Sequence, residues 1–216
     1  MKKKAARWKI VLALVGVGAC SISGAAAAIK KELDLFGVMF IAAVTGLGGG
    51  ILRDILLSNL PPAMFKDPSF IAVSAATSLV VFLIARFFQA FFQKEHRHGE
   101  WFINFFDALG LGAFTVLGIN TALNQGFTDN AFFLVFIGMT TGIGGGVLRD
   151  VLLDEIPHIF TKHVYAIATI AGAILYVVLV LYVHLSEVWC ALATVLLVVI
   201  LRLLAAQFRW NFPKAY

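Results

Sequence analysis

Seven segments of about 20 mostly apolar residues limit what this chain can fold into, because a helix of that length spans the hydrocarbon core of a membrane. The segments are residues 10–29, 35–57, 69–92, 102–123, 131–153, 163–184 and 188–208. They are too long for strands of a membrane barrel, which alternate over roughly 10 residues. Hydrophobic residues make up 61% of the chain, against about 45–50% in a soluble domain. The sequence therefore predicts an all-α, multi-pass integral membrane protein.

A glycine-rich motif occurs twice inside these segments. Residues 45–57 read TGLGGGILRDILL, and residues 141–153 read TGIGGGVLRDVLL. The copies are 96 residues apart, and Pro61 and Pro157 follow at the same offset. Each glycine costs a helix interior about 1 kcal/mol relative to alanine, and charges inside a membrane are costly and usually functional. We therefore expect the functional centre to lie at these two stretches.

The repeat extends beyond the motif. Gly16, Gly18 and Gly24 of the first segment match Gly110, Gly112 and Gly118 of the fourth at an offset of 94. Two repeats of three helices, residues 1–92 and 101–184, are thus predicted, with residues 188–208 as an appended helix. Because three is odd, the second repeat enters the membrane from the opposite side, so the repeats are inverted. The basic N-terminus and the apolar run after it imitate a signal peptide, but cleavage would remove the first helix of repeat one.

The three consecutive glycines are predicted to break each motif helix. A break leaves unpaired carbonyls, which lipid cannot satisfy and which can replace part of a cation's hydration shell. Threonine hydroxyls one turn earlier add neutral oxygens. Tight helix packing by small residues is the alternative interpretation. The candidate pore-lining or ion-binding residues are Thr45, Gly48, Gly49, Gly50, Thr141, Gly144, Gly145 and Gly146.

Each motif also carries an adjacent arginine and aspartate, Arg53–Asp54 and Arg149–Asp150. Neighbouring helical residues point to different faces, so we expect no pairing within a motif. The inverted repeat instead predicts crossed pairs, Arg53 with Asp150 and Arg149 with Asp54. Alternatively, the arginines bind the freed carbonyls and act as gates against cations.

Asp107 is a further candidate, about two turns inside the fourth segment. The first repeat has Ala13 at the corresponding position, so the symmetry is broken there. Asp107 is predicted either to line a polar cavity or to cap an interfacial contact. Cys20 and Cys190 lie inside apolar segments, where we expect small buried hydrophobes and no disulfide.

The doubled Gly-Gly-Gly-x-x-Arg-Asp, each followed by a proline, resembles the trimeric intracellular cation (TRIC) channel family in its bacterial branch, and proteins labelled as glycine transporters. The resemblance covers almost the whole chain. It implies seven helices, a homotrimer with one pore per protomer, and potassium and other monovalent cations as permeants. It also implies that the two glycine triplets are kinks facing the pore. The Lys-Glu-Val motif of the animal channels is missing from the fourth segment, so voltage or lipid control of the animal kind is not expected.

Two functions remain open at this point. One is a passive monovalent cation channel of the potassium type, and the other is a secondary transporter of a small zwitterion such as glycine. No histidine–carboxylate cluster, activated serine or metal spacing favours a membrane enzyme, and no basic–aromatic stretch favours nucleic acid. Expected partners are membrane lipid, small cations and two further copies of the chain. We expect no cofactor, no bound metal centre and a location in the bacterial inner membrane.

Overall fold

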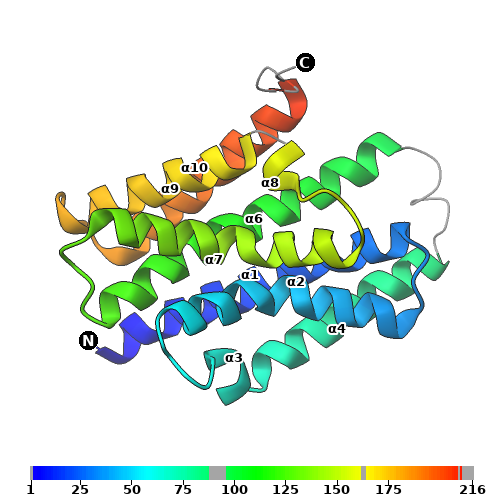
Figure 1. The fold of residues 1–216 in the computed structure, drawn as a ribbon, viewed down its shortest axis with the longest axis horizontal. Coiled ribbons are helices and arrows are strands. Elements are labelled where there is room, and N and C mark those ends of the chain that lie inside the picture. Colours follow the sequence, from blue (N-terminus) through cyan, green and yellow to red (C-terminus); the bar gives the residue numbers. More distant parts are fainter. Residues whose placement is uncertain (1, 88–95, 162–163, 209, 211–216) are drawn as a thin grey trace.

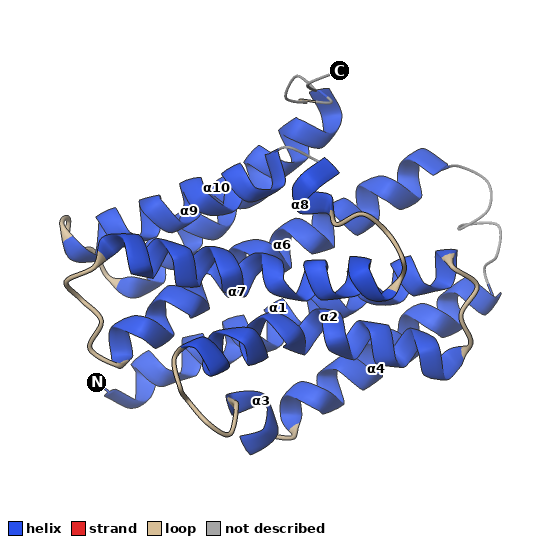
Figure 2. Cartoon of the chain, viewed as in Figure 1, coloured by secondary structure: helices blue, strands red, loops and turns tan. Residues whose placement is uncertain are grey.

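The computed structural model describes residues 2–87, 96–161, 164–208 and 210, and all regular structure within those ranges is helical (Figure 2). The seven long helices correspond to the seven predicted segments, and two short helices follow the motif helices. They are α1 (Lys2–Lys30), α2 (Leu35–Leu56), α3 (Ala63–Lys66), α4 (Ser69–Phe87), α6 (His96–Asn124), α7 (Ala131–Leu152), α8 (His158–Thr161), α9 (Val164–Leu181) and α10 (Glu187–Phe208). The end of the third predicted segment, residues 88–92, lies outside the described residues.

The predicted membrane protein is confirmed by the length and composition of these helices. Six described helices are long and apolar enough to cross a membrane, and the apolar stretch Tyr165–Leu181 of α9 is shorter. Many large apolar side chains on the outer helices are exposed, such as Leu83 and Ile84 on α4 and Leu192 and Leu196 on α10. Lipid can surround such side chains as well as protein can, so this surface suits a membrane and not water.

Four helices form the centre of the bundle (Figure 1). The most extensive helix contacts are those of α1 with α2 and α6, and of α7 with α2 and α6. Helix α4 packs beside α1 and α2, while α9 packs in the corresponding way beside α6 and α7. Helix α10 has no counterpart in the first half and packs on α6 and α9.

The motif helices α2 and α7 run in opposite directions (Figure 1). Thr45 lies against Gly145, whereas Gly49, one turn later in α2, lies against Thr141, one turn earlier in α7. This reversal of order is what the inverted three-plus-three fold requires, so that prediction is confirmed. The precise repeat boundaries at 92, 101 and 184 remain a prediction.

Equivalent polar residues begin the two motif helices. The side chain of Asp34 accepts a hydrogen bond from the amide of Gly37 at 2.8 Å, and that of Asn130 accepts one from Phe133 at 2.9 Å. Each satisfies one of the amides that a helix leaves unpaired at its N-terminus. Because Asp34 and Asn130 are 96 residues apart, both repeats place their motif at the same depth in the helix.

Candidate functional site

The two motif helices touch at their glycines. A Cβ atom on Gly49 would overlap the backbone carbonyl of Thr141, and one on Gly145 would overlap the backbone carbonyl of Thr45. A Cβ on Gly48 would lie only 2.7 Å from Cδ1 of Leu148. Only residues without a side chain allow two helix backbones to approach this closely. The crossing of α2 and α7 is therefore built from glycine, with the two backbones in close contact at Gly49 and Gly145.

The predicted helix breaks are wrong for this structure. Both α2 and α7 continue as α-helix through their glycine triplets and end only at Leu56 and Leu152. The glycines satisfy a packing requirement instead: Gly49 and Gly145 face the backbone of the opposite helix, whereas Gly50 and Gly146 face the side chains of Met64 and Tyr165. No carbonyls are freed there, so free carbonyls cannot be the source of cation attraction in this arrangement.

The candidate threonines lie at the same crossing and are buried. The hydroxyl of Thr45 donates to the carbonyl of Ile41, and that of Thr141 donates to the carbonyl of Ile137, both at 2.6 Å. Bonds of this kind to the preceding turn often bend helices slightly. Each hydroxyl oxygen keeps a lone pair available, so both threonines remain possible neutral acceptors.

The predicted crossed ion pairs are also wrong, because each arginine pairs with its own neighbour. Arg53 donates through Nε at 2.9 Å and Nη2 at 2.8 Å to Oδ1 of Asp54. Arg149 makes the same two contacts to Oδ1 of Asp150, both at 2.8 Å. The argument from opposite helix faces overlooked the length of the arginine side chain, which lets a guanidinium curve around the helix. A fork of two N–H donors on one carboxylate is a strong charge-assisted contact.

The second oxygen of each aspartate holds the short helix that follows. Oδ2 of Asp54 accepts from the amide of Ala63 at 2.8 Å, and Oδ2 of Asp150 accepts from the amide of His158 at 2.8 Å. These amides open α3 and α8, where helix N–H groups lack partners. Each Arg-Asp pair therefore fixes the chain where it leaves the motif helix.

Beyond these shared contacts the two repeats differ. Nη1 of Arg149 reaches Oδ1 of Asp107 on α6 at 3.0 Å and the hydroxyl of Ser23 on α1 at 2.7 Å. Ser23 in turn donates to Asp107 at 3.2 Å. Asp107 is only 5% exposed, and it contacts the motif arginine inside the protein.

Arg53 has no such second partner among the residues that the structure describes. The positions equivalent to Asp107 and Ser23 at the offset of 94 are Ala13 and Leu117. Both belong to an apolar cluster with Leu47 and Met64. The first repeat is therefore apolar where the second is ionic.

One charged residue of this cluster was not identified from the sequence. Arg202 of α10 is 4% exposed, and its Nη2 lies 3.7 Å from Oδ2 of Asp107. Its guanidinium carbon also lies 4.4 Å from the ring centre of Tyr165, within reach of a cation–π interaction. A lone arginine in the middle of an apolar segment is the signal that points to it, since such charges are rarely tolerated without a partner.

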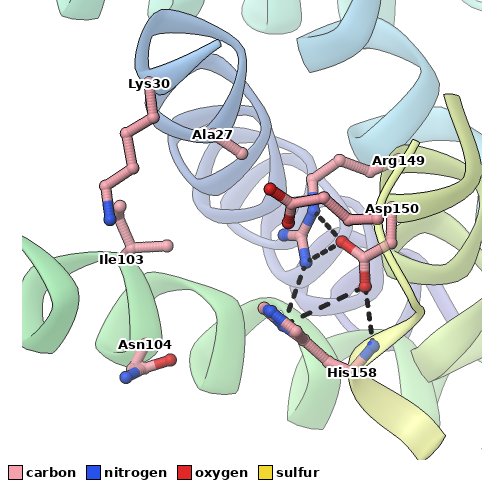
Figure 3. A pocket seen from close by; sticks show the side chains of 8 residues that line it. Ala27, Lys30, Ile103, Asn104, Arg149, Asp150 and His158 are labelled. Atoms are coloured by element: carbon pink, nitrogen blue, oxygen red, sulfur yellow. Dashed lines mark hydrogen bonds and ion pairs between the residues drawn. The ribbon is translucent and has the colours of Figure 1, made fainter. Parts of the chain in front are cut away.

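A polar pocket of about 230 Å³ opens beside this cluster, where the C-terminal ends of α1 and α7 meet the N-terminal part of α6 (Figure 3). Arg149, Asp150 and His158 lie together on one side of it, with Nη2 of Arg149 3.4 Å from Nδ1 of His158. Charges of both signs surround the pocket. It is lined by Ala27, Lys30, Ile103, Asn104, Arg149, Asp150, Glu155 and His158. Asp107 does not line this pocket but binds Arg149 behind it.

The chemistry of this region is ionic. Among the described residues, no group of three or more His, Cys, Asp or Glu side chains could hold a metal ion. Cys20 and Cys190 are free and buried. The site offers a glycine crossing in the bundle centre and, in the second repeat, a charged pocket beside Arg149 and Asp150.

A family model described as "Glycine transporter" matches the chain twice, over residues 10–86 and 104–181. The double match agrees with the sequence repeat. The chain is 36% identical to the UPF0126 inner membrane protein YadS of Escherichia coli (strain K12) over 165 residues, which cover 76% of this chain and 75% of that protein. It is 26% identical to the UPF0126 membrane protein YvgT of Bacillus subtilis (strain 168), over 96% of both chains.

Solved structures with the same fold are described as TRIC channels. A crystal structure of a prokaryotic TRIC channel in 0.5 M KCl has a TM-score of 0.84, with 31% identity and 95% of this chain and 99% of that chain covered. A structure described as the basis for conductance through TRIC cation channels has a TM-score of 0.80, with 32% identity and coverage of 95% and 96%. The TRIC orthologue from Rhodobacter sphaeroides has a TM-score of 0.83, with 27% identity and coverage of 94% and 98%.

Proposed function

Because this chain belongs to the TRIC family, whose model is described as "Glycine transporter", we propose that it is a cation channel of the bacterial inner membrane. The observation that carries the proposal is the match to TRIC cation channels over nearly the whole chain at more than 30% identity. None of the relatives and structures named above is described as an enzyme.

The finer proposal is a homotrimer that conducts potassium and other monovalent cations through one pore in each protomer. Its support within the chain is that the glycine crossing and the charged pocket both lie inside a single protomer. The pocket forms the mouth of the pathway in the second repeat. The exposed apolar faces of the outer helices are available for lipid and for neighbouring protomers.

The crossing of α2 and α7 is the gate in this proposal. In the described arrangement, backbone contact between Gly49 and Thr141 closes it. Conduction requires the two helices to separate, after which the candidate residues line the opening. Oxygens of Thr45 and Thr141 then face the ion, while the Arg-Asp pairs add no net charge near the path.

The test is a bilayer recording of the purified protein. With a KCl gradient, we expect unitary currents that reverse near the equilibrium potential of potassium. When the large cation N-methyl-D-glucamine replaces potassium on one side of the bilayer, we expect the cation current from that side to disappear. Reversal at the chloride potential, or no unitary current in an otherwise folded preparation, would contradict a cation channel.

The second candidate function is transport of glycine, which the description of the family model favours. Proteoliposomes loaded with glycine and diluted into labelled glycine separate the two functions. An exchanger accumulates label by counterflow, whereas a cation channel does not. Unitary currents in the absence of glycine exclude an obligate transporter.

The trimer is tested separately by native mass spectrometry of the detergent-solubilised protein. We expect three copies as the principal species. A preparation that conducts as a monomer would remove the trimer from the proposal and leave the pore within the protomer intact.

A further inference from the structure

Two buried charges among the described residues lie outside the repeat pattern. Asp107 has an alanine, Ala13, at the equivalent position of the first repeat. Arg202 belongs to α10, which has no equivalent among the described helices of the first repeat. Both are almost fully buried, at 5% and 4% exposure. An isolated buried charge is costly, so each requires compensation within the protein.

The fold brings these two charges together. Arg202 and Asp107 are 95 residues apart in the sequence, yet Nη2 of Arg202 lies 3.7 Å from Oδ2 of Asp107. A backbone approach makes this possible, because a Cβ on Gly112 of α6 would lie 3.1 Å from Cα of Val195 on α10. The absence of a side chain at Gly112 thus lets α10 pack close enough to α6 for Arg202 to reach Asp107.

The charges of the four residues joined by these contacts sum to zero. Arg149 and Arg202 carry two positive charges, and Asp107 and Asp150 carry two negative charges. In the first repeat, Arg53 and Asp54 balance without any further residue. The additional negative charge of the second repeat, Asp107, is therefore balanced by the additional positive charge of α10, Arg202.

Neither charge of this pair is fully satisfied by its present contacts. Among the residues that the structure describes, Oδ2 of Asp107 and Nε of Arg202 are buried and find no hydrogen-bond partner. Their interaction is thus mainly electrostatic and is set by how α10 packs. Oδ1 of Asp107, in contrast, is occupied by Arg149 and Ser23.

We propose that Arg202 is a positioning residue for permeation: it neutralises Asp107, the carboxylate that holds the guanidinium of Arg149 at the wall of the charged pocket. The proposal rests on the cation channel function proposed above. Helix α10 is in this view part of the ion pathway's electrostatics, although its backbone lies outside the two repeats.

The proposal predicts effects of opposite sign for its two members. Arg202→Gln leaves the cluster with one net negative charge, which attracts cations into the pathway. Asp107→Asn leaves one net positive charge, which repels them. We expect potassium conductance at low salt to rise in the first and fall in the second, each by roughly threefold, because a charge a few ångströms from the path is only partly screened. The double variant restores neutrality and is expected to conduct in the wild-type range.

Matched variants separate charge from structure. Arg202→Lys keeps the positive charge, and its potassium conductance should stay near that of the wild type. Arg86→Gln removes an exposed arginine from α4 and should leave conductance unchanged. If a single variant does not fold, recovery of folding in the double variant supports the same pairing. Two single variants that change conductance in the same direction, or a double variant that adds their losses, would overturn the proposal.

A wild type without current would refute the channel and not this pairing. Thermal unfolding of the wild type, the two single variants and the double variant in detergent then decides whether Arg202 and Asp107 form a pair. Losses in melting temperature that are non-additive in the double variant support it, because contacting residues couple and distant ones do not. Additive losses overturn it.

Discussion

At the scale of single residues, the helix glycines of this protein differ in how much space surrounds them. Gly49→Ala is expected to lower the melting temperature, because its Cβ would overlap the backbone carbonyl of Thr141, which cannot move alone. Gly18→Ala is the matched control, since its Cβ would meet Val73 at an ordinary 3.8 Å. The control should be neutral or stabilising by up to about 1 kcal/mol through helix propensity. Thermal unfolding in detergent compares them, and equal melting temperatures would contradict the crossing.

The glycine positions also test the gate. Gly49→Leu and Gly145→Leu are expected to reduce conductance sharply in whatever fraction folds, because a large side chain at the crossing obstructs the opening. Bilayer recordings on the trimeric fraction of each variant measure the conductance. Unchanged conductance in both variants would mean that the glycine crossing does not line the path.

A surface ion pair predicts a small pH dependence of stability. Nζ of Lys31, the residue after α1, lies 3.0 Å from Oε1 of Glu155, and its hydrogen bond lowers the pKa of the Glu155 carboxyl below the ordinary 4.5. The stabilisation is therefore present above pH about 4.5 and is lost as the pH falls through the lower folded-state pKa. Because both groups are partly exposed, we expect about 0.5 kcal/mol. The free energy of unfolding, measured between about pH 3 and 6, should lose this pH-dependent contribution in Glu155→Gln. A pH profile identical to that of the wild type would argue against the ion pair.

At the scale of elements, the aspartates of the two motifs join each long helix to the short helix after it. Asp150→Ala is expected to speed amide hydrogen exchange in α8, because the amide of His158 loses its acceptor. His158→Ala is the control, since that bond uses the backbone amide and survives the substitution. Similar exchange rates in both variants would show that α8 does not depend on Asp150.

The same aspartates support their arginines. Removing one partner of a buried ion pair typically costs about 3–5 kcal/mol, so Asp54→Ala and Asp150→Ala should both destabilise the protein. Arg149 retains Asp107 in Asp150→Ala, whereas Arg53 retains no carboxylate in Asp54→Ala among the described residues. Chemical unfolding is therefore expected to rank Asp54→Ala as the more damaging change, and the reverse order would contradict the asymmetry of the repeats.

At the scale of the whole molecule, the two repeats interlock. Contacts of α1 with α6 and of α2 with α7 are as extensive as those within each repeat. Neither residues 1–92 nor residues 93–216 alone can bury these surfaces. We expect each half alone to aggregate or be degraded, and the co-expressed halves to copurify. A stable half in isolation would show that the repeats are independent units.

The sequence by itself determined the class of protein and its internal symmetry. Helix number follows from the length of apolar runs, which a linear chain displays directly. The inverted arrangement follows from the 96-residue offset between Arg53 and Arg149 and from an odd number of helices per repeat. These properties depend on order along the chain, and order along the chain is what a sequence contains.

Only the tertiary structure decided how the motif works. Three glycines permit either a break or a close helix contact, and the backbone of Thr141 opposite Gly49 selects the contact. Likewise, the partner of Arg149 depends on the rotation of α7 and on side-chain reach, which bring it to Asp150 and Asp107 and leave Asp54 to Arg53. Arg202 joins this cluster only because α10 packs on Gly112. Interactions across helices depend on crossing geometry, and that geometry is settled by all the packed surfaces together.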